Sequence, residues 1–189
     1  AKLYDEEGYL KTGDAVRMFD ARDPGKGIVF DGRIAEDFKL LTGTWVSVGP
    51  LKTKIVLHFA PYVRDLVMTG ADRDEIGVLI FADGVACRAL TPDLPKDAPD
   101  SAVFRHQAVR DRFAVLLSEL AKEATGSATR VTRAMILEEP PSIDKHEVTD
   151  KGSLNARALT DNRKDLVAEL YGDAPSPRVI LATLAKSPA

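Results

Sequence analysis

Residues 31–50, DGRIAEDFKLLTGTWVSVGP, place a glycine two residues before the only tryptophan of the chain. Glycine inside a strand loses conformational entropy and offers no side chain to a core. Gly43 therefore indicates a place where another group approaches the backbone closely. The alternative is a tight turn between two strands, with Trp45 packed in the core.

On the N-terminal side of this stretch, residues 9–19 and 28–34 have the pattern of two short strands. The segment between them includes DARDPGKG, whose Pro-Gly pair and second glycine are typical of turns. The sequence thus predicts a β-hairpin. Because an isolated hairpin is marginally stable in water, this one must pack either on the rest of the chain or on a sheet outside it.

On the C-terminal side, Leu51, Ile55 and Phe59 recur every four residues after Pro50, which is typical of an amphipathic helix. The further elements expected are strands at 63–70, 76–83 and 129–137, a helix at 101–124 with Ser101 as N-cap and Gly126 as terminator, and a helix at 155–171. This order predicts an α+β domain, a small β-sheet covered by helices. The tail, 172–189, is not assigned, and packing on the domain or against a partner both stay open.

Composition places the chain among ordinary globular domains. Its 189 residues are 44% hydrophobic and 29% charged, and the formal net charge of −3 is spread without a basic block. This argues against a nucleic-acid partner and against a polybasic membrane anchor. No apolar run approaches the ~18 residues of a spanning helix, and the N-terminal residues do not resemble a signal peptide. We therefore expect a cytoplasmic location and no membrane partner.

Cysteine and histidine are sparse. The single cysteine, Cys87, has no partner for an internal disulfide and is expected to act as a small buried hydrophobe. His58, His106 and His146 lie far apart without paired ligand spacing. No metal site is expected from them.

Two charged residues fall at the same end of the predicted hairpin. An ionised Asp14 offers two acceptor oxygens that suit the vicinal hydroxyls of a ribose, and the guanidinium of Arg33 is a fork of donors suited to ribose or phosphate oxygens. The alternatives are a turn aspartate bonded to its own backbone and a surface arginine paired with Asp14 or Asp31.

Three segments together carry a resemblance: GYLKTGD, then FDGRIAEDFKLLTGTWVSVGP, then TDKGSLNARAL. In this order they resemble the last third of adenylate-forming enzymes, the superfamily of acyl-CoA synthetases, luciferases and peptide-synthetase adenylation domains. The second segment is most similar to feruloyl-CoA synthases and related aryl-CoA ligases. The resemblance spans roughly residues 4–171.

The resemblance implies a division of the chain. Residues 1–33 would be the terminal hairpin segment of a larger N-terminal domain, 34–171 a mobile C-terminal catalytic domain, and 172–189 a tail. It also implies that Asp14 and Arg33 bind the ribose of ATP and of acyl-AMP.

Further roles follow from the same resemblance. Ala35 matches the hinge about which the C-terminal domain rotates, where many members have Asp or Lys. Gly43, with Thr44 and Trp45, matches the loop that lies along the pantetheine arm of coenzyme A.

The resemblance also implies a catalytic lysine that draws together the substrate carboxylate and the α-phosphate. Lys151 falls at this position, and a point cation on a long arm suits the charge that develops at phosphorus. Members usually have glycine before this lysine, whereas here Gly152 follows it. Lys145 is a competing candidate.

The implied reaction joins an aromatic carboxylic acid to coenzyme A with ATP, through an acyl-adenylate, and with Mg²⁺ on the phosphates. Nothing in the chain supplies the Ser/Thr/Gly-rich phosphate loop of these enzymes, so the N-terminal domain of the same enzyme is the expected partner. We expect this chain alone to be inactive. The alternative is a non-catalytic α+β protein-interaction module, which the uncharged hinge and the inverted Lys-Gly order favour.

Overall fold

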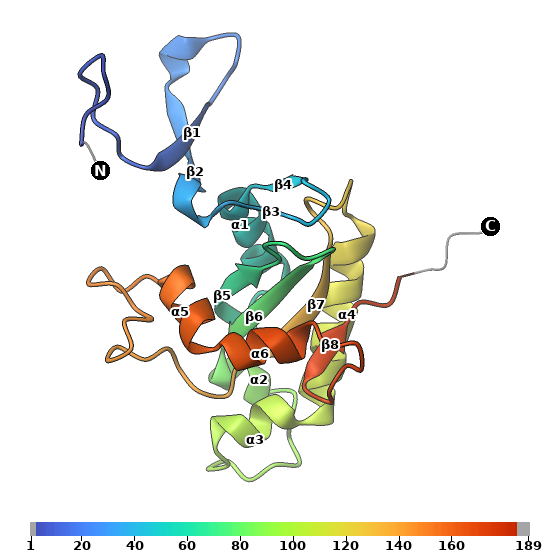
Figure 1. The fold of residues 1–189 in the computed structure, drawn as a ribbon. Coiled ribbons are helices and arrows are strands. Elements are labelled where there is room, and N and C mark those ends of the chain that lie inside the picture. The colour runs from blue at the N-terminus through green and yellow to red at the C-terminus, as the bar shows by residue number, and fades with distance from the viewer. Residues whose placement is uncertain (1–2, 185–189) are drawn as a thin grey trace, which may run out of the picture.

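The computed structural model describes residues 3–184. Its centre is a four-stranded sheet in the order β5-β6-β7-β8 (Figure 1). β5 (Val63–Thr69) and β6 (Ile76–Ala82) are antiparallel, β7 (Val131–Ile136) runs parallel to β6, and β8 (Val179–Leu181) is antiparallel to β7.

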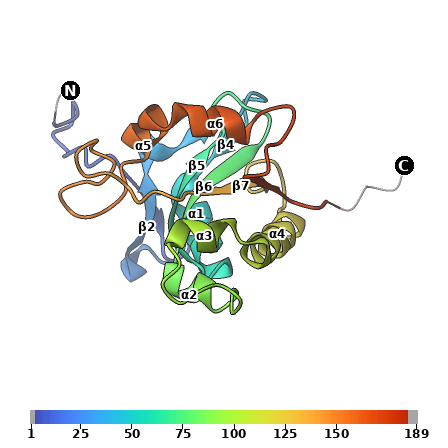
Figure 2. The same ribbon diagram turned by 90° about the horizontal axis from the view of Figure 1, so that it is seen from below.

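Helices cover both faces of this sheet (Figure 2). They are α1 (Val48–His58), α2 (Gly84–Arg88), α3 (Asp100–Arg105), α4 (Gln107–Lys122), α5 (Ala156–Asn162) and α6 (Lys164–Leu170). The helices α5 and α6 lie on one face, and α1 to α4 lie on the other. Because side chains alternate along a strand, the two faces of the sheet bury two separate clusters.

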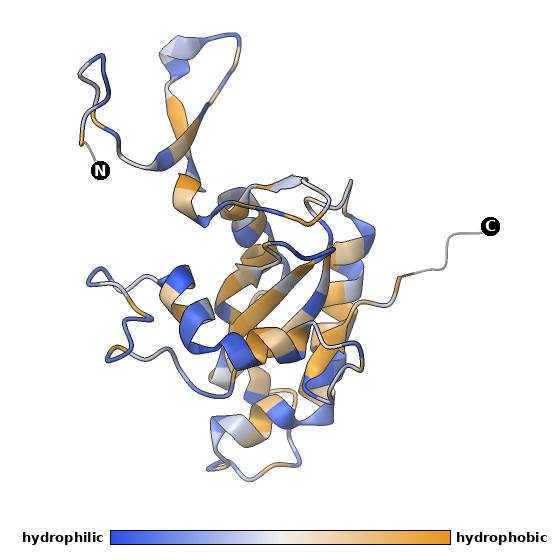
Figure 3. Cartoon of the chain, in the orientation of Figure 1, coloured by the Kyte–Doolittle hydropathy of each residue, from blue (hydrophilic) through white to orange (hydrophobic). Residues whose placement is uncertain are grey.

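The central strand β6 shows this alternation. Val78 and Ile80 belong to the cluster shared with α1 and α4, whereas Leu79 and Phe81 belong to the cluster that includes Leu159 of α5. Every residue of β6 is buried, as expected for a strand with both faces covered. Figure 3 shows the apolar sheet inside and the polar residues toward the surface.

The predicted α+β fold is confirmed, with strands in all three expected regions of the sheet and a helix that has Pro50 in its first turn. The prediction of one continuous helix at 101–124 is wrong. The region forms two helices, α3 and α4, because the backbone of His106 between them is extended (φ −62°, ψ 138°). His106 Nε2 lies 3.0 Å from Asp93 Oδ2, and its Nδ1 accepts a hydrogen bond from the backbone N of Ala108. The side chain therefore caps α4 while a distant loop holds it.

The termini of this helical region also differ from expectation. Its first residue is Asp100, so Ser101 lies inside α3 and is not the N-cap. The helix α4 ends at Lys122, before Gly126, which belongs to the following turn. The expected single helix at 155–171 is likewise two helices, with a non-helical Arg163 between them (φ −109°, ψ 30°).

The N-terminal hairpin is confirmed, but its first strand is shorter than expected. β1 (Asp14–Met18) pairs antiparallel with β2 (Ile28–Arg33), the short 3₁₀ turn Pro24–Lys26 lies between them, and the hairpin stands away from the body (Figure 1). Large apolar side chains on both strands and beside them are about half exposed or more: Val16, Met18, Phe19, Ile28 and Phe30. Such a surface is typical of an interaction site.

The segment left unassigned by sequence packs on the domain in part. β8 forms an edge of the sheet, and the Arg110 guanidinium donates to the carbonyls of Arg178 and Val179 at 3.2 and 3.3 Å. Beyond the strand, the backbone N of Thr183 donates to Ser118 Oγ at 2.9 Å. Residues 185–189 of the tail lie outside the described residues.

Within residues 3–184, none of the helices has the length and apolarity needed to cross a membrane. The same part of the chain brings together no group of three or more His, Cys, Asp or Glu side chains suited to a metal ion.

Cys87 is fully buried in α2, as the sequence predicts, and its Sγ lies 3.9 Å from the carbonyl oxygen of Tyr62. Burial raises the pKa of the thiol to about 12, with smaller contributions from Asp83 and Asp100. Since the thiolate is the nucleophile, we expect no reaction with a thiol reagent at pH 8 in the native protein and one reacting thiol in denaturant. Stoichiometric reaction of the native protein would contradict this.

Asp83 caps α2 and stabilises it in a pH-dependent way. Its Oδ1 accepts a hydrogen bond from the backbone N of Ala86 at 2.8 Å, and its Oδ2 lies 2.9 Å from Arg64 Nε. The first contact and then the second lower its pKa from the ordinary 3.8. The contribution is therefore present above pH 3.8 and is lost as pH falls toward the lower folded-state value.

We expect Asp83→Ala to lower the free energy of unfolding by about 1 kcal/mol at pH 7. The difference from wild type should shrink in urea titrations as the pH falls below 3.8 and vanish below the lowered pKa of the folded state, where the wild-type carboxylate is itself protonated. Asp97→Ala, at an exposed loop carboxylate, is the matched control and should have no such effect. A deficit that stays constant across this pH range would contradict the assignment.

Candidate functional site

The hairpin places Asp14 and Arg33 directly opposite each other, as predicted. Asp14 is partly buried and Arg33 is exposed. Among residues 3–184, no ion pair joins Arg33 to Asp14 or Asp31; Asp31 pairs instead with Arg17, at 3.5 Å. The guanidinium and the Asp14 carboxylate are thus both available to a ligand at this end of the hairpin.

The segment after the hairpin contains the predicted hinge residue. Ala35 is exposed and lies in the short 3₁₀ turn Ile34–Glu36. Two contacts fix the chain on either side of it. A Cβ on Gly49 would lie 2.5 Å from the carbonyl oxygen of Asp31, so only glycine permits this approach of β2 to α1. After the turn, Asp37 Oδ1 accepts a hydrogen bond from the backbone N of Val48 at 2.8 Å and caps α1.

Gly43 lies at the tip of a small hairpin formed by β3 (Phe38–Lys39) and β4 (Trp45–Val46). Its φ is +80°, a region that glycine enters without steric cost, and its N–H donates to the carbonyl of Leu40 at 2.8 Å. Apart from Gly43 itself and its two chain neighbours, no residue has an atom within 4 Å of the position that a Cβ would take there. The tip is therefore open to solvent.

The rest of this hairpin corrects one alternative. Trp45 is 51% exposed, so the reading with its ring in the core is wrong; Lys39 Nζ lies 5.8 Å from the ring centroid instead. The hairpin is held from below by the turn between β5 and β6, because Leu41 N donates to Arg73 O and Asp72 N donates to Lys39 O. Thr44 forms a hydrogen bond with Thr42 across the tip, Oγ1 to Oγ1.

Lys151 lies in a turn of the loop between β7 and α5. Val148 and Leu154 form an isolated antiparallel bridge, and the Thr149 N–H donates to the Ser153 carbonyl at 2.8 Å. Gly152 has φ +81° and donates to the carbonyl of Thr149. The turn thus requires its left-handed residue directly after the lysine, which is a physical reason for the Lys-Gly order.

The Lys151 side chain is exposed. Among the described residues, its ammonium forms no ion pair and no hydrogen bond with a protein group, so nothing there prevents it from facing a neighbouring domain. Lys145 is also exposed, but its backbone is held on both sides. Its N–H donates to Ser142 Oγ at 3.3 Å, and its carbonyl accepts from Asn162 Nδ2 at 2.9 Å.

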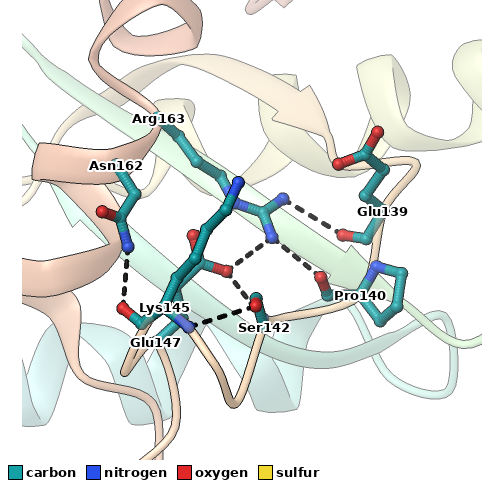
Figure 4. A network of polar contacts seen from close by, with 7 residues as sticks. All are labelled: Glu139, Pro140, Ser142, Lys145, Glu147, Asn162 and Arg163. Atoms are coloured by element: carbon teal, nitrogen blue, oxygen red, sulfur yellow. Dashed lines mark hydrogen bonds and ion pairs between the residues drawn. The ribbon is translucent and has the colours of Figure 1, made fainter.

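The loop that carries both lysines is anchored by an ion pair that the sequence did not indicate (Figure 4). The carboxylate of Glu147 is 1% exposed and accepts two hydrogen bonds from the Arg163 guanidinium, from Nε at 3.0 Å and from Nη2 at 2.7 Å. Arg163 holds the pKa of Glu147 below its ordinary value, against the opposing effect of burial. No helical or strand spacing relates these two residues in the sequence.

The predicted site residues are not brought together in one place. The loop before α5, which carries Lys151, extends from the left of the body in Figure 1, whereas the β3–β4 hairpin, which carries Gly43, lies above the sheet. Asp14 and Arg33 lie on the N-terminal hairpin, at a third location. The roles assigned to these residues by resemblance stay predictions.

Comparison with known proteins identifies relatives of the whole domain. Residues 37–175 match the family described as AMP-binding enzyme C-terminal domain. Among curated proteins, the chain is 22% identical to a probable acyl-activating enzyme 16, chloroplastic, from Arabidopsis thaliana. The aligned region covers 90% of this chain and 24% of that protein. It is also 22% identical to a long-chain-fatty-acid–[acyl-carrier-protein] ligase from the same plant, over 90% and 22% of the two chains.

Solved structures show the same fold. The A domain of a carboxylic acid reductase from Segniliparus rugosus, in complex with AMP and a co-purified carboxylic acid, superposes with a TM-score of 0.64 at 19% identity, covering 89% of this chain and 24% of that one. The adenylation domain of the Mycobacterium chelonae carboxylate reductase gives 0.61 at 20% identity, covering 90% and 24%. The chain thus spans about a quarter of the length of these relatives.

The family match covers strands β5, β6 and β7 of the sheet, the helices on both of its faces and the loop with Lys151, which is most of the chain; β8 lies beyond it. The solved adenylation domains share the fold of this chain. This chain therefore belongs to the family of C-terminal domains of AMP-binding, adenylate-forming enzymes.

Proposed function

We propose that this chain is the mobile catalytic domain of an ATP-dependent acid–thiol ligase that works together with a larger N-terminal domain. Carboxylate and ATP would give acyl-AMP and pyrophosphate, and a thiol would then displace AMP from the acyl carbon. The observation that carries the proposal is the placement of Lys151, whose exposed ammonium projects from a well-defined turn with no protein partner among residues 3–184. A cation in this state is available for the phosphate of a nucleotide held elsewhere.

The separation of Lys151 from the Gly43 tip supports a mechanism in two steps. One edge of the domain would serve adenylation with Lys151, and the other would serve thiol transfer with the open backbone of Gly43 beside Thr44 and Trp45. Since one orientation cannot present both edges to the same nucleotide, the domain would rotate about Ala35 between the steps.

The N-terminal hairpin supports the requirement for a larger partner. Its apolar side chains are exposed on a two-stranded sheet separate from the central one, and a two-stranded hairpin is marginally stable without further packing. We propose that it is covered by the N-terminal domain of the same enzyme. There Asp14 and Arg33 would bind the ribose of ATP or acyl-AMP, while Mg²⁺ on the phosphates would be held mainly by that domain.

The substrate class proposed is an aromatic carboxylic acid, with feruloyl-type acids first, and coenzyme A as the thiol. The similarity of the sequence of residues 32–51 to feruloyl-CoA synthases and related aryl-CoA ligases supports this choice. The test is ATP–pyrophosphate exchange with the full-length enzyme against matched panels of aromatic and aliphatic acids. If none of the acids supports exchange, the non-catalytic interaction module is favoured. If only long aliphatic acids support exchange, the aromatic assignment is wrong.

A second acceptor is the phosphopantetheine thiol of a carrier protein. The name of one curated relative supports it, since that protein is described as an acyl-carrier-protein ligase. The full-length enzyme, loaded with acyl-AMP, should therefore be offered coenzyme A and a phosphopantetheinylated carrier protein separately. Faster acyl transfer to the carrier protein would replace coenzyme A as the acceptor.

A further inference from the structure

The loop between β7 and α5, residues 138–155, has almost no regular structure of its own. Its single β-type pairing is the isolated antiparallel bridge between Val148 and Leu154. A loop of this length inside a compact domain is ordered only when specific contacts hold it. The position of Lys151 is therefore set by the few side chains that tie this loop to the body.

One guanidinium makes most of these ties. Arg163 stands at the break between α5 and α6, where its non-helical backbone directs the side chain toward the loop. Its Nη1 donates to the carbonyl of Glu139 at 3.1 Å, and its Nη2 donates to the carbonyl of Pro140 at 2.8 Å (Figure 4). The same group grips both carboxylate oxygens of Glu147. The start of the loop and its middle are thus fixed to one point.

Glu147 extends the connection toward Lys151. Its Oε2 also accepts from the backbone N of Ser142 at 2.8 Å, and its own carbonyl accepts from the backbone N of Asn155 at 2.8 Å. The side chain of Asn155 in turn caps α5 by accepting from Ala158 N. Both ends of the 148–154 turn are therefore tied, directly or through one residue, to Glu147.

Stability alone does not account for such a pair. A buried ion pair is often replaced by well-packed apolar residues without loss of stability, and its best-attested use is to specify one arrangement. The pair connects the loop to the break between α5 and α6 and does not join two helices (Figure 4). This placement is typical of a device that fixes geometry.

We infer that Glu147 and Arg163 are positioning residues for the adenylation step: they hold the 148–154 turn so that the Lys151 ammonium reaches the α-phosphate. The inference rests on the proposed function. Because a misplacement of about 1 Å can cost about 10²-fold in rate, a weakened anchor should affect the step that uses Lys151 and spare the step that does not.

The test uses Arg163→Lys in the full-length enzyme. Lysine keeps the charge but lacks the planar fork that grips two carboxylate oxygens and two carbonyls. We expect kcat for ATP–pyrophosphate exchange to fall about 10-fold or more, with KM for ATP changed less than about 3-fold. Thiol transfer from synthetic acyl-AMP should stay within about 3-fold of wild type. Arg157→Lys, an exposed arginine on α5, is the matched control and should change neither step.

The decisive measurement repeats Arg163→Lys in a Lys151→Ala background. A residue that acts through Lys151 should cause no further loss there, whereas independent effects multiply. The inference is overturned if the loss persists undiminished in that background, or if both half-reactions fall together. Asn162→Ala, which removes one exposed hydrogen bond to the Lys145 carbonyl, gives a milder perturbation. If Arg163→Lys prevents folding, Asn162→Ala replaces it in the test. Asn162→Ala should lower exchange, spare thiol transfer and cause no further loss when Lys151 is already alanine. A loss of exchange that persists in the Lys151→Ala background would equally overturn the inference.

Failure of the inference is separable from failure of the proposed function. If the wild-type enzyme shows ATP–pyrophosphate exchange with none of the acids, the proposed function itself is wrong. If wild type is active and Lys151→Ala is not, but Arg163→Lys retains full exchange, only the positioning role is removed.

Discussion

Replacing Lys151 by alanine in the full-length enzyme is expected to lower the rate of ATP–pyrophosphate exchange by about 10²–10³-fold. The exposed Lys151 side chain projects from a turn whose backbone is fixed by the hydrogen bonds of Thr149 and Gly152. Removing it deletes a cation at the charge that develops on phosphorus and leaves the surrounding fold unchanged. The unfolding midpoint of the variant should therefore equal that of wild type.

Two further variants make this result specific. Lys145→Ala removes the competing lysine of the same loop, and Lys164→Ala removes an exposed cation at the start of α6. We expect both to retain exchange within about 3-fold, since a solvated surface charge acts weakly at a distance. A large loss in Lys145→Ala with normal exchange in Lys151→Ala would move the catalytic assignment to Lys145. Exchange within a few-fold in all variants would remove lysine catalysis by this loop.

The elements that sequence reasoning located well are those with a strong apolar pattern. β5, β6 and β7 are short apolar runs between turn residues, and the apolar face of α4 repeats with helical spacing. Their burial against each other in the structure follows from that pattern. The α+β class was therefore predictable from local information alone.

The features that sequence reasoning missed depend on contacts distant along the chain. The apolar pattern continues through His106 and Arg163, but their side chains bond to Asp93 and Glu147, and these contacts accompany the two breaks. β8 is three residues long and pairs with a strand more than forty residues earlier, which no local pattern reveals.

The residues of the candidate site also differ in how far the sequence alone predicts them. Asp14 and Arg33 were placed together by hairpin pairing, which is a local rule. Lys151, Gly43 and Ala35 came from resemblance, and composition or periodicity alone would not have selected them. Glu147 had no signal, because its burial follows from a partner on a different element.

Phe113 is the side chain whose loss should most affect stability. It is fully buried in α4, and its ring centroid lies 5.8 Å from that of Phe59 in the turn after α1 and 6.3 Å from that of Tyr62. It thus fills the space between α4 and the end of α1, on the face of the sheet opposite α5 and α6. Phe113→Ala should lower the free energy of unfolding by about 3–5 kcal/mol, because the cavity adds to the lost burial.

That loss is a large part of the ~5–15 kcal/mol that stabilises a typical domain, so urea denaturation of the chain should show a clear shift in midpoint with little change in slope. Val115→Ala is the matched control, since Val115 is on the same helix but 48% exposed, and it should cost less than about 1 kcal/mol. Phe113→Leu, which keeps most of the volume, should fall between them. Equal midpoints for Phe113→Ala and Val115→Ala would show that the contact between α1 and α4 is not part of the stable core.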